Sequence, residues 1–186
     1  MTPEEQEAFN LHVRNGYKSP GEKSNLSHLM GKRKINLGCG GAPEPVWNGW
    51  LNVDINQRSP AGVIYDMRAG WPFAPQSFDT ALAYQLFYVF SFGEEMFHVL
   101  AGIWDILKPG GFLVSAVPMG ASGFPLQKSI WGERTPHMLV KSAYFQSEVS
   151  TTCWDQGLPI KDWVLVGVEK PDLLWFVLQR PVHALQ

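Results

Sequence analysis

The sequence predicts an α/β domain with a mostly parallel, seven-stranded sheet, helices on both faces of that sheet, and an antiparallel β-hairpin at its C-terminal end. Three observations lead to this prediction. Short apolar segments recur along the chain, and several end in glycine or in an acidic residue. Helical periodicity over residues 94–107 separates two of these segments, as a crossover between parallel strands requires. The last two segments are joined by residues 169–172, a connection short enough for a hairpin.

The chain has 186 residues, which is enough for one domain with its own hydrophobic core. Thr2 has the position of an N-cap and predicts a short helix over residues 3–15. Residues 16–31 are rich in Gly, Ser, Asn and Pro, which predicts a loop or a flexible lid. We therefore expect an N-terminal helix and flexible segment over residues 1–32, followed by a single domain over residues 33–186.

The regular elements follow from periodicity and from breaker residues. Residues 108–111, Lys-Pro-Gly-Gly, predict the end of the helix over 94–107, and residues 135–153 can form a further helix. The carboxyl ends of parallel strands share one edge, and ligands bind along that edge in such sheets. The expected strands are residues 34–37, 50–55, 62–66, 78–84, 112–117, 162–168 and 173–179.

The composition disfavours some classes of protein. Hydrophobic residues make up 45% of the chain and charged residues 17%, which is typical of a globular protein. The formal net charge of -2 provides no basic field for a phosphate backbone, so nucleic acid is disfavoured as a partner. We interpret one local basic stretch as a solvated arm rather than a nucleic-acid patch. Its members are Arg14, Lys18, Lys23, Lys32, Arg33 and Lys34.

The two cysteines and the apolar runs bear on metal binding and location. Cys39 and Cys153 are far apart and have no zinc-ligand spacing, so we expect no metal. Two isolated thiols suit a reducing compartment. The acidic N-terminus lacks the apolar run of a signal peptide, and the longest apolar stretch, residues 80–92, is too short for a membrane helix. We expect a cytoplasmic protein without a membrane segment.

A glycine turn follows the first expected strand and precedes an acidic strand end. Glycines at residues 38, 40 and 41 allow a tight turn and close approach of a ligand to the backbone. Asp54 ends the second strand, where a carboxylate can accept hydrogen bonds from ribose hydroxyls; a surface aspartate is the alternative. It lies 14 residues after Gly40, less than the spacing near 20 of a dinucleotide fingerprint. Pro43 and Pro45 also hinder the helix that a dinucleotide site needs.

A second acidic position follows the third expected strand. Asp66 can accept a hydrogen bond from an adenine amino group while the ring packs on the thioether of Met67. Asp66 can instead cap a turn.

With these motifs, the sequence resembles the class I S-adenosylmethionine-dependent methyltransferases, in particular the type-11-like subgroup of predicted methyltransferases. The resemblance covers residues 33–118 and implies a Rossmann-like fold. It rests on Ile35 to Gly40, Gly49 to Asp54, Trp71-Pro72-Phe73 followed by Ser77-Phe78-Asp79, and Leu107 to Phe112.

The resemblance implies that S-adenosylmethionine binds and that S-adenosylhomocysteine is the product. Gly38 and Gly40 would hold the methionine part, Asp54 the ribose, and Asp66-Met67 the adenine. The expected cofactor-binding residues are Asn36, Gly38, Cys39, Gly40, Asp54, Ile55, Asp66, Met67, Tyr84 and Gln85.

Two departures from the family pattern affect the expected chemistry. Asn36 replaces the acid that is usual before the first glycine, and should still bind the polar end of the cofactor. Residues 84–89, Tyr-Gln-Leu-Phe-Tyr-Val, stand where the subgroup often has Ser-His-x-Leu-Glu-His. The candidates left for catalysis are Tyr84 and His137, the latter as a general base or, alternatively, as a solvent-exposed histidine.

The expected reaction is in-line displacement at the sulfonium methyl group, with a small molecule or a saccharide as acceptor. The alternatives are a catalytically inactive methyltransferase-like binding or interaction module and a nicotinamide-dependent oxidoreductase. Little chain extends beyond the core fold. The sequence therefore leaves open whether the site is open to solvent or is completed by a second copy or a partner subunit.

Overall fold

A computed structural model describes residues 33–41, 43, 49–121, 123, 125–140, 159, 161–169 and 173–182. The predictions for residues 1–32, for Cys153 and for most of the expected helix over 135–153 lie outside these ranges. The division of the chain at residue 33 therefore stays a prediction.

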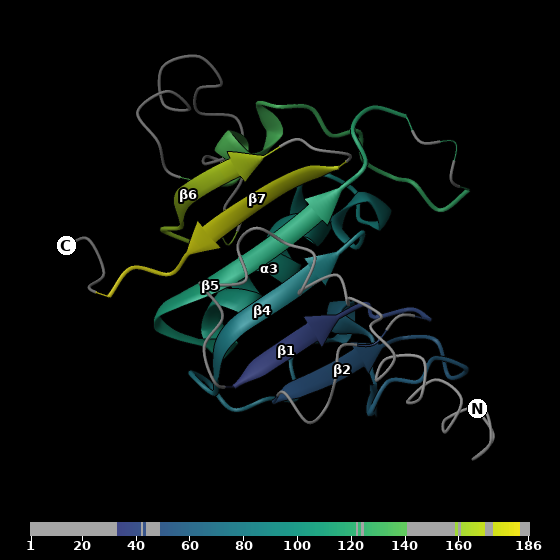
Figure 1. Ribbon diagram of the computed structural model, residues 1–186, viewed down its shortest axis with the longest axis vertical. Coiled ribbons are helices and arrows are strands. Elements are labelled where there is room, and N and C mark those ends of the chain that lie inside the picture. The colour runs from purple at the N-terminus through teal and green to yellow at the C-terminus, as the bar shows by residue number, and fades with distance from the viewer. Residues whose placement is uncertain are drawn as a thin grey trace, which may run out of the picture.

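Seven strands form one sheet in the order β3-β2-β1-β4-β5-β7-β6 (Figure 1). Neighbours among β1 to β5 pair in parallel, whereas β7 pairs antiparallel with both β5 and β6. This confirms the mostly parallel sheet and the C-terminal hairpin. The strands are β1 (Lys34–Leu37), β2 (Trp50–Asp54), β3 (Val63–Ile64), β4 (Phe78–Tyr84), β5 (Leu107–Val117), β6 (Val164–Glu169) and β7 (Leu174–Gln179).

The predicted start of the fifth strand, at residue 112 after the Lys-Pro-Gly-Gly stop signal, is wrong. Helix α3 (Glu94–Ile106) ends before residues 108–111, and these residues belong to β5, which begins at Leu107. Two contacts explain the difference. The Arg180 guanidinium donates to the Trp104 and Leu107 carbonyls at the end of α3, and Gly111 fits closely against the Asp79 carbonyl. Hydrogen bonding from elsewhere in the chain therefore decides where the helix stops and the strand starts.

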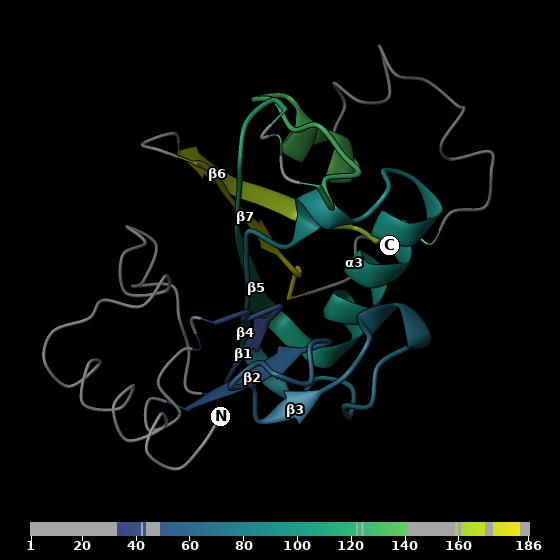
Figure 2. The same ribbon diagram turned by 90° about the vertical axis from the view of Figure 1, so that its right-hand side faces the viewer.

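The larger hydrophobic core lies between the sheet and α3, which covers one face (Figure 2). Ile35 and Leu37 of β1 point into it, as the two-residue period of a strand requires. A smaller cluster, with Trp50, Leu82 and Trp175, is formed by the strand residues that point to the other face of the sheet.

Helical structure in the described ranges is limited to α3 and short 3₁₀ turns. Of the helix expected over 135–153, the structure describes a 3₁₀ turn, Thr135–Leu139. Helices on the second face of the sheet are not among the described elements.

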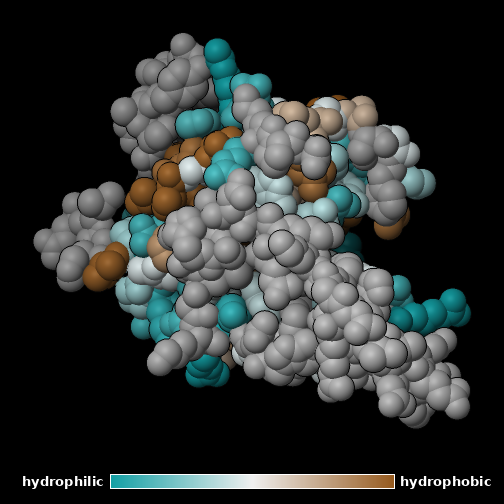
Figure 3. All heavy atoms as spheres, in the orientation of Figure 1, coloured by the Kyte–Doolittle hydropathy of each residue, from teal (hydrophilic) through white to brown (hydrophobic). Residues whose placement is uncertain are grey.

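Strand β6 is the edge strand on one side of the sheet. Val164 and Val166 are exposed on this edge strand, and Figure 3 shows apolar surface at the same end of the molecule. No helix within the described ranges is long and apolar enough to cross a membrane.

Candidate cofactor site

The glycine turn after β1 is tied to the end of β2. The backbone N–H groups of Gly38 and Cys39 donate to the Val53 carbonyl at 2.8 and 3.2 Å. Gly38 and Gly40 have φ of 65° and 56°, a left-handed conformation that favours glycine. A Cβ on Gly38 would lie 2.6 Å from Leu86 Cδ1, whereas one on Gly40 or Gly41 would meet no atom of a described residue within 4 Å. As far as the described residues go, the outer side of the turn is thus open backbone that a ligand can approach.

Asp54 links the turn to the loop after β2. Its Oδ2 accepts a hydrogen bond from the Gly40 N–H at 2.6 Å, and its Oδ1 accepts one from the Asn56 N–H at 2.7 Å. The residue is 7% exposed. A carboxylate offers about four lone-pair sites, so each oxygen keeps capacity for a further donor such as a ribose hydroxyl. The next residue, Ile55, is 54% exposed and places an apolar surface beside the carboxylate.

Asn36 and Asn52 form a buried polar pair beneath this edge. The Asn36 Nδ2 donates to Asn52 Oδ1 at 2.9 Å, between neighbouring strands β1 and β2. Both side chains are buried. The pair therefore fixes the orientation of the Asn36 amide at the end of β1.

Cys39 contributes to the shape of the turn. Its Sγ lies 3.3 Å from Ser59 Oγ, and that hydroxyl donates to the Gly40 carbonyl at 2.6 Å. Burial raises the pKa of the Cys39 thiol to about 11, so it stays protonated near neutral pH. The sequence did not point to Ser59, because the contact joins positions 20 residues apart and no local pattern marks it.

Asp66 caps a turn in this structure. Its Oδ1 accepts from the Arg68 N–H at 3.0 Å, which caps the 3₁₀ turn Met67–Ala69. Arg68 also forms an ion pair with Asp66 at 2.8 Å, and this hydrogen-bonded guanidinium holds the pKa of the Asp66 carboxyl below its usual value. Met67 is buried in the core and presents little surface. The turn-capping alternative is thus realised, and adenine would share Asp66 with Arg68.

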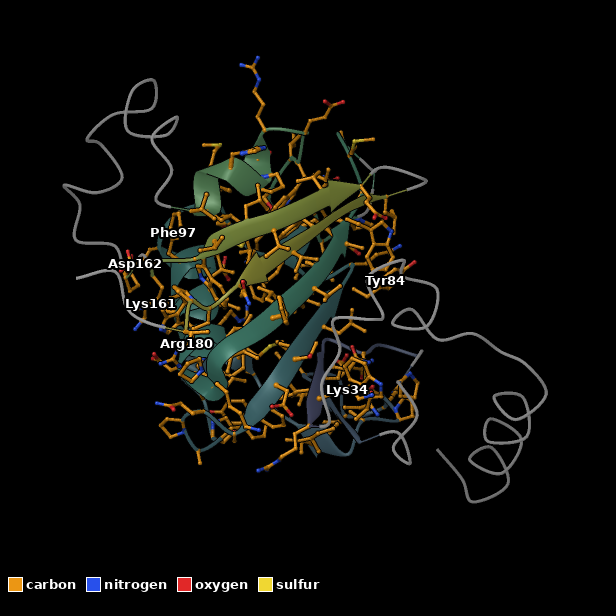
Figure 4. The ribbon with its side chains drawn as sticks, turned by 60° about the vertical axis from the view of Figure 1, so that its left-hand side comes forward. Lys34, Tyr84, Phe97, Lys161, Asp162 and Arg180 are labelled. Carbon is orange, nitrogen blue, oxygen red and sulfur yellow. The ribbon has the colours of Figure 1, made fainter. Side chains whose placement is uncertain are left out.

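Tyr84 ends β4 and Gln85 follows it, on the same edge as the glycine turn. The Tyr84 ring lies 5.7 Å from that of Trp175, centroid to centroid. Figure 4 shows Tyr84 at this edge of the sheet. Gln85 has φ of 51°, unusual for a residue other than glycine, and its N–H donates to the Ala116 carbonyl at 2.7 Å. Its side chain is exposed. Non-glycine residues in this conformation carry strain and are frequent at functional sites.

His137 lies elsewhere. It is exposed on the 3₁₀ turn Thr135–Leu139, and that turn contacts β6. Four strand steps separate β6 from β1, which is about 19 Å at the usual spacing between strands. The structure therefore brings together the glycine turn, Asp54, Ile55 and the end of β4, but it does not place His137 beside them.

Trp131 lies in the loop after β5, where an aromatic side chain can form a wall for a ligand or anchor the loop. The structure shows an anchor. The side chain is buried, its Nε1 donates to Ser129 Oγ at 2.9 Å, and its ring stacks on Phe176 with centroids 5.4 Å apart. Phe124, an aromatic residue of the same stretch of sequence, lies outside the described residues.

Metal ligands do not gather in the part of the chain that the structure describes: it contains no group of three or more His, Cys, Asp or Glu residues placed to hold an ion. The site consists of backbone, carboxylate and apolar surface.

The strand order, the antiparallel β7 and the glycine turn beside an acidic end of β2 together define the class I fold of S-adenosylmethionine-dependent methyltransferases. No protein-family model matches the chain, and no curated protein matches it. The type-11-like subgroup therefore stays a prediction.

Several solved structures are similar to the chain. The chain is 12% identical to an S-adenosylmethionine-dependent methyltransferase from Methanosarcina mazei, covering 85% of this chain and 97% of that one at a TM-score of 0.56. It is 15% identical to 1,6-didemethyltoxoflavin-N1-methyltransferase from Burkholderia thailandensis, which was solved with 1,6-didemethyltoxoflavin and S-adenosylhomocysteine. The match covers 87% of this chain and 77% of that one at a TM-score of 0.57. The [4+2]-cyclase SpnF is also similar, at 15% identity, 83% and 77% coverage and a TM-score of 0.51. At these identities the likeness shows the fold alone.

Proposed function

We propose that this protein is an S-adenosylmethionine-dependent methyltransferase whose acceptor is a small molecule or a saccharide. The observation that carries the proposal is the open glycine turn held by Asp54, because it joins a closely approachable backbone to a carboxylate with spare acceptor capacity. The methyltransferase fold and the Burkholderia neighbour, which was solved with S-adenosylhomocysteine, support the same cofactor.

The residues at this edge fit the parts of that cofactor. The backbone of residues 38–41 would face the methionine part, Asp54 the ribose hydroxyls, and the exposed Ile55 side chain one face of the adenine. When bound, the cofactor supplies an activated methyl group together with its own leaving group. The task left to the chain is to orient the acceptor and to exclude water.

The end of β4 bears on the acceptor. Tyr84 and Gln85 offer a hydroxyl and an amide, which can orient a ligand by hydrogen bonds. This suits an acceptor that is already nucleophilic. The small-molecule ligand of the Burkholderia enzyme supports a small acceptor for this chain. We also propose a cytoplasmic location and completion of the site by a second copy or a partner subunit.

The first test is isothermal titration of the purified protein with S-adenosylmethionine and, separately, with NAD. We expect one-to-one binding of S-adenosylmethionine only. Asp54→Asn should weaken it at least about tenfold, since hydrogen bonds to a charged group are lost. Ile55→Ala should weaken it about fivefold by removing apolar contact. Val182→Ala is the matched control, because Val182 is comparably exposed and lies close to Gly110 at the opposite end of β5.

Absence of binding at millimolar S-adenosylmethionine, from protein shown to be folded, would overturn the proposal, as would preferential binding of NAD. Binding without release of S-adenosylhomocysteine across a broad metabolite screen would instead favour the inactive module. One observation supports that second candidate: residues 84–89 contain neither the His nor the Glu that the subgroup often has there.

A further inference from the structure

The loop after β5 presents apolar side chains to solvent at the edge of the sheet that holds the glycine turn. Met119, Leu126 and Ile130 are 46%, 63% and 69% exposed, and we call these three residues the apolar patch. Figure 1 shows the loop leaving β5 at the edge where β1 and β4 also end. Single exposed apolar residues are common on protein surfaces, whereas several in one place indicate a contact surface.

The side chains of the apolar patch come from positions that meet at Gly120. The Gly120 N–H donates to the Trp131 carbonyl at 2.8 Å, and the Gln127 side-chain amide donates to the Gly120 carbonyl at 2.9 Å. Each member of the patch directly precedes one of these three residues in the sequence. The patch is therefore gathered around one point of the loop rather than scattered along it.

The polar side chains of the same loop are engaged within the protein. Gln127 also donates to the Ser129 carbonyl at 3.0 Å, and the Ser129 hydroxyl donates to the Phe87 carbonyl at 3.2 Å. The Lys128 ammonium pairs with the Glu95 carboxylate at 3.3 Å. A surface loop usually has the reverse arrangement, with polar side chains in water and apolar ones covered. This loop instead uses its polar groups to hold apolar side chains out into solvent, where a ligand can cover them.

The apolar patch lies close to the end of β4. The Gln85 N–H donates to the Ala116 carbonyl of β5 at 2.7 Å, and Met119 follows three residues after Ala116. At most about 11 Å of chain therefore separates Met119 from the residue that binds Gln85. The returning part of the loop is also held there, because the Lys128 N–H donates to the Tyr88 carbonyl at 2.8 Å. A small molecule oriented at the end of β4 is thus within reach of the patch.

We propose that the methyl acceptor carries an apolar body, aromatic or hydrocarbon, which binds to the apolar patch while its nucleophilic group lies at the end of β4. This inference rests on the proposed function, and it selects an apolar small molecule over a saccharide. The hydroxyl groups of a saccharide would lose water against these side chains without gaining hydrogen-bond partners, whereas an apolar body is driven onto them by the hydrophobic effect. The patch then determines which acceptor binds, and Tyr84 and Gln85 orient it.

The test compares 2-naphthol with methyl β-glucoside as probes of the full chain, by isothermal titration without cofactor. We expect naphthol to bind one-to-one and at least about tenfold more tightly than the glucoside. Met119→Gln and Ile130→Gln should each weaken naphthol binding about fivefold. The melting temperature should not change, since both side chains are exposed. Val182→Gln is the matched control, because Val182 is as exposed as Leu126 and lies close to Gly110 at the opposite end of β5.

A second measurement places the probe relative to the cofactor site. With S-adenosylhomocysteine and naphthol both bound, we expect nuclear Overhauser effects between protons of the two ligands, because the patch and the glycine turn share one edge of the sheet. Simultaneous binding of both ligands without such effects would overturn the placement of the acceptor.

Other outcomes would also overturn the proposal. These are no naphthol binding, equal binding of the glucoside, or an equal loss of binding in Val182→Gln. A dimer that Ile130→Gln converts to a monomer would assign the patch to a second copy of the chain. Sedimentation with phosphatidylcholine vesicles that Ile130→Gln abolishes would assign it to a lipid surface. Failure of S-adenosylmethionine to bind would overturn the proposed function, whereas the naphthol titration contains no cofactor and tests the apolar ligand site by itself.

Discussion

The three glycines of the turn after β1 are sequence neighbours, but they meet different surroundings. Gly38 combines a φ of 65° with close contact to Leu86, Gly40 has a φ of 56° and open space, and Gly41 has neither constraint. A side chain at each position therefore tests a different physical effect. Conformational strain acts at Gly40, strain plus overlap acts at Gly38, and only the entropy of the unfolded chain acts at Gly41.

We predict that alanine substitutions destabilise the protein in the order Gly38, Gly40, Gly41. Gly40→Ala should lower the free energy of unfolding by about 1–2 kcal/mol, the cost of a left-handed L-residue. Gly38→Ala should cost roughly 1–2 kcal/mol more, because the methyl group displaces the buried Leu86. Gly41→Ala should be neutral or stabilising by less than about 1 kcal/mol. Urea denaturation measures all three, and equal effects at Gly38 and Gly41 would contradict this explanation.

The residues of the site differ in how well the sequence could predict them. Asp54 was predicted from its place at a strand end after a glycine turn, and the structure does put its carboxylate on Gly40. Ser59 and Leu86 also shape the turn, but their contacts cross loops, and no spacing rule reveals them. The arrangement of Asp66 was left open, since a carboxylate at a strand end can bind a ligand or cap a turn with the same local sequence.

At the scale of elements, α3 contains a glycine that serves packing. Gly102 lies in the middle of the helix, where glycine costs about 1 kcal/mol relative to alanine. A Cβ there would overlap the indole of Trp71, which packs against the same core as the helix. The missing side chain thus allows residues 65–77, between β3 and β4, to approach the helix.

We predict that Gly102→Ala destabilises the protein by about 1–3 kcal/mol, the usual cost of overpacking, despite the gain in helix propensity. In a Trp71→Ala background the same substitution should become stabilising, because only the propensity gain remains. Thermal and urea denaturation of the two single variants and the double variant give this double-mutant cycle. Destabilisation of the same size in both backgrounds would show that Trp71 is not the cause.

Element boundaries were predictable where the pattern is local. β1 and β4 have the expected ends, since apolar runs of the right length are bounded by turn residues. The start of β5 was not predictable, because the sequence Lys-Pro-Gly-Gly at residues 108–111 indicates an interruption of regular secondary structure when it is considered alone. Pairing with β4 and the hydrogen bonds from Arg180 overrule it. β3 has two residues instead of the five expected, since only Val63 and Ile64 find partners in β2.

At the scale of the whole molecule, the hairpin completes the sheet in an order that the sequence does not specify. The four-residue connection predicts that β6 and β7 pair, but either strand could then lie next to β5. The structure places β7 inside, between β5 and β6. The burial pattern agrees with this choice. β7 carries five consecutive buried residues, as a strand buried on both faces does, whereas β6 has exposed positions typical of an edge.

This order makes the C-terminal strand part of the core, and deletion tests it. A chain lacking residues 173–186 loses the side chains of Leu174, Phe176 and Leu178, all fully buried, and leaves β6 without a partner. Each lost side chain is worth about 2–5 kcal/mol, so the total approaches the whole stability of a typical domain. We therefore expect the shortened chain to lack a cooperative unfolding transition and near-ultraviolet circular dichroism. Deletion of residues 183–186 alone is the control and should leave both unchanged. A cooperative transition in the longer deletion would mean that β1 to β5 with α3 fold without the hairpin.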